Sequence, residues 1–348
     1  MDNNLFLIDS RENIISALKQ LNNLSSYALV LFVKNEFDQI IGSLTDGDIR
    51  RALISGTQLT ERVENVMHSD FKYLDEQSGD ITVKIKEIKK MGVQVIPVLS
   101  SNKHLIRIFD LKKFVSIIPI DAVLMAGGKG ERLRPLTEKI PKPLLPVGDK
   151  CIIDHNIDRL ISYGVEHISV TCNYLKEQLY SHFEITRNKV KVNCVTEPKF
   201  LGTIGSIKFV ETFYNDTILV MNSDLFTDIN YEDFYLHFKE YDADMSVAAV
   251  PYTVSVPYGI MDLDGRNLKG MIEKPTYNYY ANAGIYLIKR SMLDLIPEGE
   301  FFHATHLIDS ILKNGGKIIR FPINGTWIDI GNFQEYQKAK ELVKHIKG

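Results

Sequence analysis

A glycine-rich turn followed by basic residues is the part of the sequence best suited to chemistry. The turn Gly127–Gly130 reads Gly-Gly-Lys-Gly, and the cations that follow it closely are Arg132, Arg134, Lys139 and Lys142. Glycines allow backbone N–H groups to approach an anion closely. This much positive charge suits a triphosphate whose leaving group is pyrophosphate. The segment therefore predicts a site for phosphate groups.

Several other kinds of site are not indicated. The chain contains no Gly-Lys-Ser or Gly-Lys-Thr, so the turn is not a Walker A loop, and it lacks the third glycine of a dinucleotide fingerprint. The three cysteines are odd in number and far apart, which favours reduced thiols. His303 and His306 are three residues apart, and a helix surface or a site rim explains them better than zinc.

The elements after residue 119 alternate short apolar strands with amphipathic helices, which predicts βαβ units on a mostly parallel sheet. A strand over 120–126 leads into the glycine turn at the edge where such sheets bind nucleotides. Strand-rich sequence follows Asp244. We expect helices over 154–164, 175–183, 205–213 and 332–346.

The elements before residue 119 form a pattern that occurs twice. The first copy reads helix 10–23 with Ser10 as N-cap, strand 27–33, strand 40–45 and helix 46–56. The second copy reads helix 78–92, strand 93–100, strand 105–109 and helix 110–118. A repeat of this size predicts two similar units packed on each other, in a smaller α+β domain.

The first copy resembles a CBS domain in its segment Gly-Ser-Leu-Thr-Asp-Gly-Asp. The resemblance implies an adenine nucleotide as ligand, with Thr45 at a phosphate and Asp48 at the ribose hydroxyls. Alternatively, Thr45 merely caps a helix that has Asp48 in its first turn. Phe109 and Lys112 stand at the corresponding places of the second copy, so at most one such site is complete. The resemblance implies a CBS pair over 1–118 with a regulatory or oligomerisation role.

The glycine segment resembles the signature of sugar-1-phosphate nucleotidyltransferases. The segment reads Leu-Met-Ala-Gly-Gly-Lys-Gly-Glu-Arg-Leu-Arg-Pro. Further segments that resemble the family follow in the same order along the chain: EPKFLGTIGSI, VMNSD, IEKP, NAGIY and WIDIG. Ile204 replaces the alanine usual in the first of these. The resemblance runs from about Asp121 to Gly331 and implies a Rossmann-like α/β domain over 119–348. It also implies Mg²⁺-dependent transfer from an NTP to a sugar 1-phosphate.

The resemblance also assigns catalytic roles. Arg132 would hold the β- and γ-phosphates, Lys142 would bridge the two reacting phosphates, and Lys274 would meet the sugar phosphate. Asp224 and Asp329, each at a strand end, would bind the metal ion through hard oxygen ligands. Because a phosphate monoester is already a nucleophile at pH 7, no general base is required.

The remaining site residues also come from the resemblance. The residues that the resemblance places at the nucleotide are Leu124, Ala126, Gly127, Gly128, Glu197, Gly202 and Thr203. The sugar would meet Gly259, Glu273 and Asn282. Glu197 would suit guanine N1–H and N2–H₂, although a structural role is equally open to it. Trp327 is better explained by core packing.

Several functions remain open at this point. GTP is the favoured donor, and the product would serve surface glycan synthesis. The alternatives are a CMP-, UDP- or dTDP-sugar pyrophosphorylase, a phosphocholine cytidylyltransferase, or a non-catalytic nucleotide sensor. A net charge of -3 and the absence of a long apolar run or basic leader predict no nucleic-acid partner, no membrane span and a cytoplasmic location. We expect a homo-oligomer, either a dimer or a tetramer.

Overall fold

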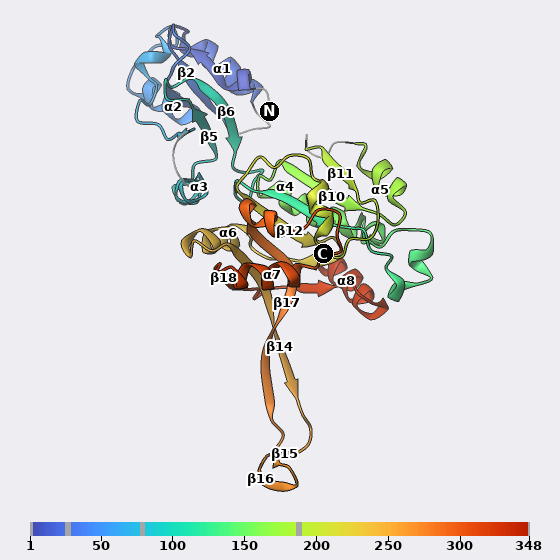
Figure 1. Cartoon of the computed structure of the whole chain (residues 1–348). Helices are drawn as coiled ribbons and strands as arrows, with labels where there is room; N and C mark the ends of the chain where they lie inside the picture. Colours follow the sequence, from blue (N-terminus) through green and yellow to red (C-terminus); the bar gives the residue numbers. More distant parts are fainter. Residues whose placement is uncertain (1–2, 25–28, 77–80, 186–189, 347–348) are drawn as a thin grey trace. The chain divides into compact units, whose positions relative to one another are not determined.

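The chain divides into two compact units, Met1–Ile117 and Ile118–Gly348 (Figure 1). The structure is a computed structural model that describes residues 3–24, 29–76, 81–185 and 190–346. The predicted beginnings of a strand at 27 and of a helix at 78 lie outside these described residues. Each unit is considered by itself below. Among the described helices, none is long and apolar enough to cross a bilayer.

The first copy of the repeat forms a three-stranded sheet flanked by two helices. Its elements are β1 (Leu7–Asp9), α1 (Ile14–Asn23), β2 (Val30–Lys34), β3 (Ile40–Thr45) and α2 (Asp46–Ile54), after a short 3-10 helix at Asn3–Phe6. Helix α1 buries Ile14, Ala17 and Leu21 on one face. The prediction of Ser10 as its N-cap is wrong. Asn13 caps α1 by accepting from the Ser16 N–H, because the helix begins only at Ile14. Ser10 directly follows β1, and its N–H donates to the carbonyl of Lys34 at the end of β2.

The second copy repeats the sheet but not the last helix. Its elements are β4 (Leu74–Asp75), α3 (Ile81–Lys90), β5 (Val95–Leu99) and β6 (Leu105–Asp110), with a 3-10 turn at Val63–Asn65 before them. The helix predicted over 110–118 is absent from this described segment. Its carbonyl groups are used instead by α3: Lys89 donates to Phe114 and Val115, and Thr82 donates to Ile117. Those carbonyls are therefore not available for an i to i−4 ladder.

The second unit is built on a seven-stranded sheet in the order β11-β10-β7-β12-β17-β14-β18. Its strands are β7 (Asp121–Met125), β10 (His167–Cys172), β11 (Val192–Thr196), β12 (Thr217–Asn222), β14 (Met245–Ser255), β17 (Thr276–Lys289) and β18 (Ile318–Pro322). All neighbours are parallel except β17, which runs antiparallel to β12 and β14. The predicted α/β fold with a mostly parallel sheet is confirmed.

Helices cover both faces of this sheet. They are α4 (Ile152–Ser162), α5 (Lys176–Phe183), α6 (Tyr231–Glu240), α7 (Ala304–Lys313) and α8 (Phe333–Ile346). Helices α4 to α6 pack into one large apolar core, and α7 packs into another. The two cores use different residues of the strands, because successive side chains of a strand point to opposite faces of the sheet. The helix predicted over 205–213 is only a 3-10 turn, Gly205–Phe209. The Ile204 and Gly205 N–H groups both donate to the Phe302 carbonyl there.

Strands β14 and β17 continue past the sheet as a two-stranded ribbon (Figure 1). We call residues 251–280 the arm. It ends in the hairpin formed by β15 (Ile260–Asp264) and β16 (Asn267–Ile272), which we call the tip. Most side chains of the arm are exposed, in contrast to the buried inner halves of β14 and β17.

Candidate active site

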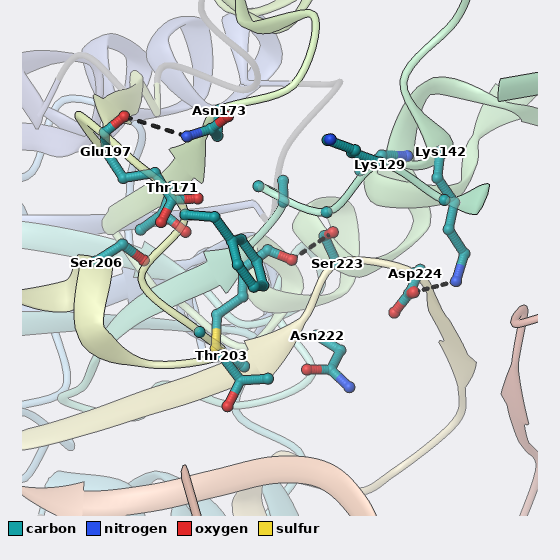
Figure 2. A pocket seen from close by; sticks show the side chains of 18 of the residues that line it. Lys129, Lys142, Thr171, Asn173, Glu197, Thr203, Ser206, Asn222, Ser223 and Asp224 are labelled. Atoms are coloured by element: carbon teal, nitrogen blue, oxygen red, sulfur yellow. Dashed lines mark hydrogen bonds and ion pairs between the residues drawn. The ribbon is translucent and has the colours of Figure 1, made fainter. Parts of the chain in front are cut away.

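A cleft of about 680 Å³ opens where β7, β10 and β12 end. Carboxyl ends of parallel strands are where open α/β sheets bind ligands. The lining comes from the glycine-rich loop, the ends of those strands and the segment after β11 (Figure 2). Its residues are Met125, Ala126, Gly127, Gly128, Lys129, Gly130, Glu131, Arg132, Lys142, Pro143, Thr171, Asn173, Glu197, Phe200, Gly202, Thr203, Ser206, Asn222, Ser223, Asp224 and Gly331.

Gly127 lies directly against the side chain of Glu197. A Cβ at Gly127 would lie 1.9 Å from Oε1 of Glu197, whereas a Cβ at Gly128 would meet no atom within 4 Å. The loop is anchored at its start by the Ala126 N–H, which donates to the Thr171 carbonyl. The glycine sequence thus brings the loop backbone directly against the glutamate.

Glu197 is a buried carboxyl group in the wall of the cleft. Its Oε2 accepts from the Leu201 N–H at 3.1 Å, which fixes the side chain, and Oε1 faces Gly127. Burial raises the pKa of Glu197 above its usual range, and the Leu201 hydrogen bond opposes this. The group is a fixed hydrogen-bond acceptor whenever it is ionised.

Two short strands bring Asp224 and Asp329 together. Strand β13 (Leu225–Thr227) pairs antiparallel with β19 (Trp327–Asp329), with Leu225 opposite Asp329. The Ile330 N–H donates to the Asp224 carbonyl at 3.2 Å. Burial raises the pKa of Asp329, and the negative charge of Asp224 raises it further. Two neighbouring carboxylates form a donor set that fits a hard divalent cation.

Lys142 and Arg132 supply positive charge to the same region. Lys142 lies in a 3-10 turn (Lys142–Leu144), is only 8% exposed, and forms an ion pair with Asp224 (Figure 2). Arg132 lies in another such turn (Glu131–Leu133), with its guanidinium group against Gly331. A small apolar cluster packs residues of and beside these two turns against residues of α8, which restrains the position of both turns.

Gly202 and Thr203 form the side of the cleft near α7. Gly202 has a φ of +81°, and a Cβ there would lie 2.6 Å from the Phe302 carbonyl oxygen. The Thr203 hydroxyl accepts from the Ala304 N–H at 2.9 Å, and the Thr203 N–H donates to Nδ1 of His303. His303 therefore lies at the rim of the cleft.

The structure brings most of the predicted nucleotide residues together, with one exception. Leu124 is fully buried within β7, and Met125 lines the cleft instead, because successive strand residues face opposite sides of a sheet. The prediction of Leu124 as a contact residue needs this correction. Asp329 adjoins the lining through its pairing with β13.

The predicted sugar residues lie elsewhere. Gly259, Glu273 and Lys274 are on the arm and outside the cleft lining. Glu273 and Lys274 are exposed, Gly259 is partly exposed, and Lys274 has a left-handed φ of +44°. Asn282 is exposed on β17, where its amide group donates to the Tyr286 hydroxyl and accepts from the Gly284 N–H. Among the described residues of one chain, none of these four lines the cleft. Their roles at a sugar stay predictions.

Several lining residues were not predicted. Thr171, Asn173, Asn222 and Ser223 all lie at strand ends, and Phe200 and Ser206 follow β11. The rule that ligands bind at the carboxyl ends of parallel strands would have selected the first four. Phe200 carried no such signal.

In the first unit, Thr45 and Asp48 form a capping box. The Thr45 hydroxyl contacts Asp48 Oδ2 at 2.6 Å, and each side chain also accepts from the other's N–H. Asp48 forms an ion pair with Arg51 as well. These bonds lower the pKa of Asp48 against the opposing effect of burial. The capping interpretation of Thr45 is confirmed, and its role at a nucleotide stays a prediction.

Comparisons with known proteins agree with this geometry. Residues 121–345 match the nucleotidyl transferase family, and residues 1–55 match the CBS domain. The bifunctional protein GlmU of Methanococcus maripaludis is 30% identical over 224 residues, 61% of this chain and 52% of the relative. The mannose-1-phosphate guanylyltransferase catalytic subunit beta of Xenopus tropicalis is 25% identical over 230 residues, 62% of each chain.

The chain thus spans less than two thirds of the length of these relatives. A Bacillus anthracis structure, provisionally assigned as a glucose-1-phosphate thymidylyltransferase, shares the fold with a TM-score of 0.52 at 23% identity, over 65% of this chain and 95% of that one. On the match over its second unit, the chain belongs to the nucleotidyl transferase family, and it carries an N-terminal CBS domain.

Proposed function

We propose that the protein transfers a nucleotidyl group from an NTP, with GTP favoured, to a sugar 1-phosphate. The observation that carries this proposal is that one cleft gathers the glycine-rich loop, Arg132, Lys142 and Asp224, with Asp329 beside them. In this reaction an oxygen of the sugar phosphate bonds to the α-phosphorus. The bond from that phosphorus to the β-phosphate oxygen breaks, and pyrophosphate leaves with its electron pair.

The chain's own residues position and neutralise charge in this proposal. Arg132 binds the β- and γ-phosphates, so that charge developing on pyrophosphate is stabilised. Lys142 lies beside Asp224 and is held between the α-phosphate and the incoming phosphate. Asp224 and Asp329 would hold Mg²⁺, which when bound supplies positive charge to the phosphates. No residue needs to act as a base, since the phosphate monoester is already ionised.

Glu197 gives a reason to favour guanine. Its carboxylate is fixed at the wall by the Leu201 N–H, and a carboxylate can accept from guanine N1–H and N2–H₂ together. The mannose-1-phosphate guanylyltransferase among the relatives supports the same base. A cytidylyl, uridylyl or thymidylyl enzyme is the alternative. We further propose that the product serves surface glycan synthesis in the cytoplasm.

Pyrophosphate release tests the proposal directly. The full chain is assayed with Mg²⁺, four NTPs and a panel of mannose, glucose, glucosamine, N-acetylglucosamine and heptose 1-phosphates, with phosphocholine included. We expect release with one NTP–sugar pair and none after chelation with EDTA. Release with phosphocholine alone would replace the sugar in the proposal. Nucleotide binding without any release would favour a nucleotide sensor.

For the first unit, taken as residues 1–118, we propose a regulatory or pairing role. An adenine nucleotide at Thr45 and Asp48 would have to share or replace the capping box of α2, so its binding would be linked to the start of that helix. Titration of the full chain with ATP, ADP and AMP, monitored by calorimetry, checks this. A chain that begins at Ile118 and keeps full activity, nucleotide response and oligomeric state would contradict it.

A further inference from the structure

A cysteine, an aspartate and a histidine meet at the start of α4 and the end of α5. Cys151 directly precedes α4, Asp154 lies in its first turn, and His182 lies in the last turn of α5. One ligand atom from each side chain, the thiol sulfur, a carboxylate oxygen and a ring nitrogen, lies within 4.8 Å of the other two. All three residues lie outside the cleft lining. Side chains of these three kinds are typical ligands of transition metals.

Asp154 is the most deeply buried member of this group, at 4% exposed. Its Oδ2 accepts from the Cys151 N–H at 3.3 Å, and its Oδ1 contacts Nε2 of His182 at 2.8 Å. A carboxylate that is removed from water needs a positive partner or a metal ion beside it, because an isolated buried charge is costly. The carboxylate of Asp154 is therefore held next to both other members of the group.

The two helices that carry the group pack on one apolar core. Ile153 precedes Asp154 and Phe183 follows His182, and both apolar side chains belong to the large core of the second unit. Cys151 and His182 are only partly buried, and 22% of the His182 side chain is exposed. The group thus combines fixed backbone positions with an entry path from solvent, which a metal site requires.

The separations within the group suit a tetrahedral ion. Bonds of about 2.3 Å to sulfur and about 2.0–2.2 Å to nitrogen and oxygen place the ligand atoms of a tetrahedral Zn²⁺ site about 3.3–3.6 Å apart. The contact between Asp154 and His182 is shorter than this, at 2.8 Å, and every separation in the group is at most 4.8 Å. Small side-chain rotations bring all three atoms onto one ion, which then replaces the direct hydrogen bond. Water fills the fourth position.

The ligand types select a different ion from the one expected in the cleft. Thiolate and imidazole favour a borderline-soft ion such as Zn²⁺, whereas Mg²⁺ prefers oxygen ligands such as those of Asp224 and Asp329. The N-terminus of α4 also favours the negative charge of a thiolate at Cys151, because the helix dipole is positive there. We therefore expect this group to prefer Zn²⁺ to Mg²⁺.

Backbone pairing links Cys151 to the turn that carries Lys142. Strand β9 (Lys150–Cys151) pairs antiparallel with β8 (Pro146–Val147), which begins soon after that turn. A metal bond at the end of β9 therefore restrains the end of the segment that starts with the glycine-rich loop.

We propose that Cys151, Asp154 and His182 form a structural site for Zn²⁺. The bound ion ties the start of α4 to the end of α5, and through β9 it restrains the turn that carries Lys142. The site does not rest on the proposed function, because none of its ligands belongs to the cleft.

Cobalt binding tests the site without any assay of activity. Co²⁺ accepts the same ligands as Zn²⁺, and its bond to a thiolate gives a charge-transfer band in the near ultraviolet. The full chain, without a polyhistidine tag and with its thiols kept reduced, is titrated with Co²⁺. We expect a thiolate band that saturates at one Co²⁺ per chain and disappears when Zn²⁺ displaces it. A chain that shows no thiolate band overturns the proposal.

Three variants assign the ligands. Cys151→Ser should abolish the thiolate band, whereas Cys194→Ser, at another partly buried free cysteine, is the matched control that should keep it. His182→Gln should weaken Co²⁺ binding about 10-fold or more, since even residues that only support a ligand cost this much when they are replaced. A band that survives in Cys151→Ser, or an unchanged affinity in His182→Gln, would overturn the proposal.

Thermal unfolding tests the structural role and separates this site from the cleft. In a buffer that already contains Mg²⁺, added Zn²⁺ should raise the Tm of the wild-type chain, because an ion that binds only the folded state stabilises it. Asp224→Asn should show the same rise, and His182→Gln should show none. An equal rise in His182→Gln would place the ion elsewhere and overturn the site. A wild-type chain that releases no pyrophosphate but keeps the Zn²⁺-dependent rise would defeat the proposed function alone.

Discussion

The glycine-rich loop and the arm carry the two halves of the predicted site, and the fold holds them in opposite ways. The loop is anchored by backbone hydrogen bonds, and its cation Lys142 is buried in an ion pair. The arm is a ribbon whose side chains are exposed almost throughout. The nucleotide half is therefore organised within one unit, whereas the sugar half depends on what the arm contacts.

The largest effect should come from the organised half. Asp224→Asn removes one of two carboxylates that fit the metal and leaves Lys142 without its ion pair. We expect a loss in kcat on the order of 10³-fold, with the fold kept, by analogy with removal of one group that stabilises transition-state charge. Steady-state pyrophosphate release measures it. Asp216→Asn, at an exposed aspartate of the same unit, should change little; equal losses would indicate general destabilisation.

A smaller effect, confined to one substrate, is expected from the arm. Lys274→Ala should lower kcat/KM for the sugar phosphate by about 10²-fold, as expected for a lost charge-assisted contact, and leave the KM for the NTP unchanged. Lys269→Ala is the matched control, because it removes an exposed lysine of the same arm. If Lys274→Ala raised the KM of the NTP instead, the division of the site into two halves would be wrong.

The two glycines of the loop allow a finer comparison inside the nucleotide half. Gly127→Ala forces Glu197 to move, since the new Cβ would overlap its carboxylate, whereas Gly128→Ala has free space. Overpacking of about 1–3 kcal/mol corresponds to a rise of roughly 5- to 150-fold in the Kd for the NTP if all of it is lost from binding. Isothermal titration of the NTP checks both variants. Similar affinities for the two would mean that the loop is not held against Glu197.

The smallest effect concerns pH. Because burial and the charge of Asp224 raise the pKa of Asp329, this side chain becomes neutral at a higher pH than an ordinary aspartate. Activity should therefore fall as the pH decreases through this raised pKa. A higher Mg²⁺ concentration should shift this fall in activity to lower pH, because the metal binds the ionised form of the Asp329 carboxyl group. Rate–pH profiles at two Mg²⁺ concentrations measure it, and Lys274→Ala should keep the same acid limb. A limb that is insensitive to Mg²⁺ would exclude Asp329 as its origin.

The sequence predicted the parts of the site that are local. The loop, Glu197 and Asp224 follow directly from strands whose ends must meet at one edge of a parallel sheet. The predictions from sequence were wrong where a choice between hydrogen-bond partners decides the local structure. Ser10 and Asn13 could both cap α1, but Ser10 continues the pairing of β1 with β2, and the helix begins only after Asn13. Residues 110–118 have helical periodicity, but Lys89 and Thr82 take up their carbonyls. The position of Lys274 depends on the direction of a long ribbon, which spacing does not encode.

The place of β17 in the sheet affects how the protein is made. Strands β7, β10, β11 and β12 are translated first and can pair among themselves, but β14 reaches them only through β17, which comes after the whole arm. Until β17 has left the ribosome, β12 is an open strand edge on an apolar sheet, which is prone to aggregation. Nascent chains that end before residue 289 should therefore need chaperones, and slow translation within the arm should lower the yield of folded protein.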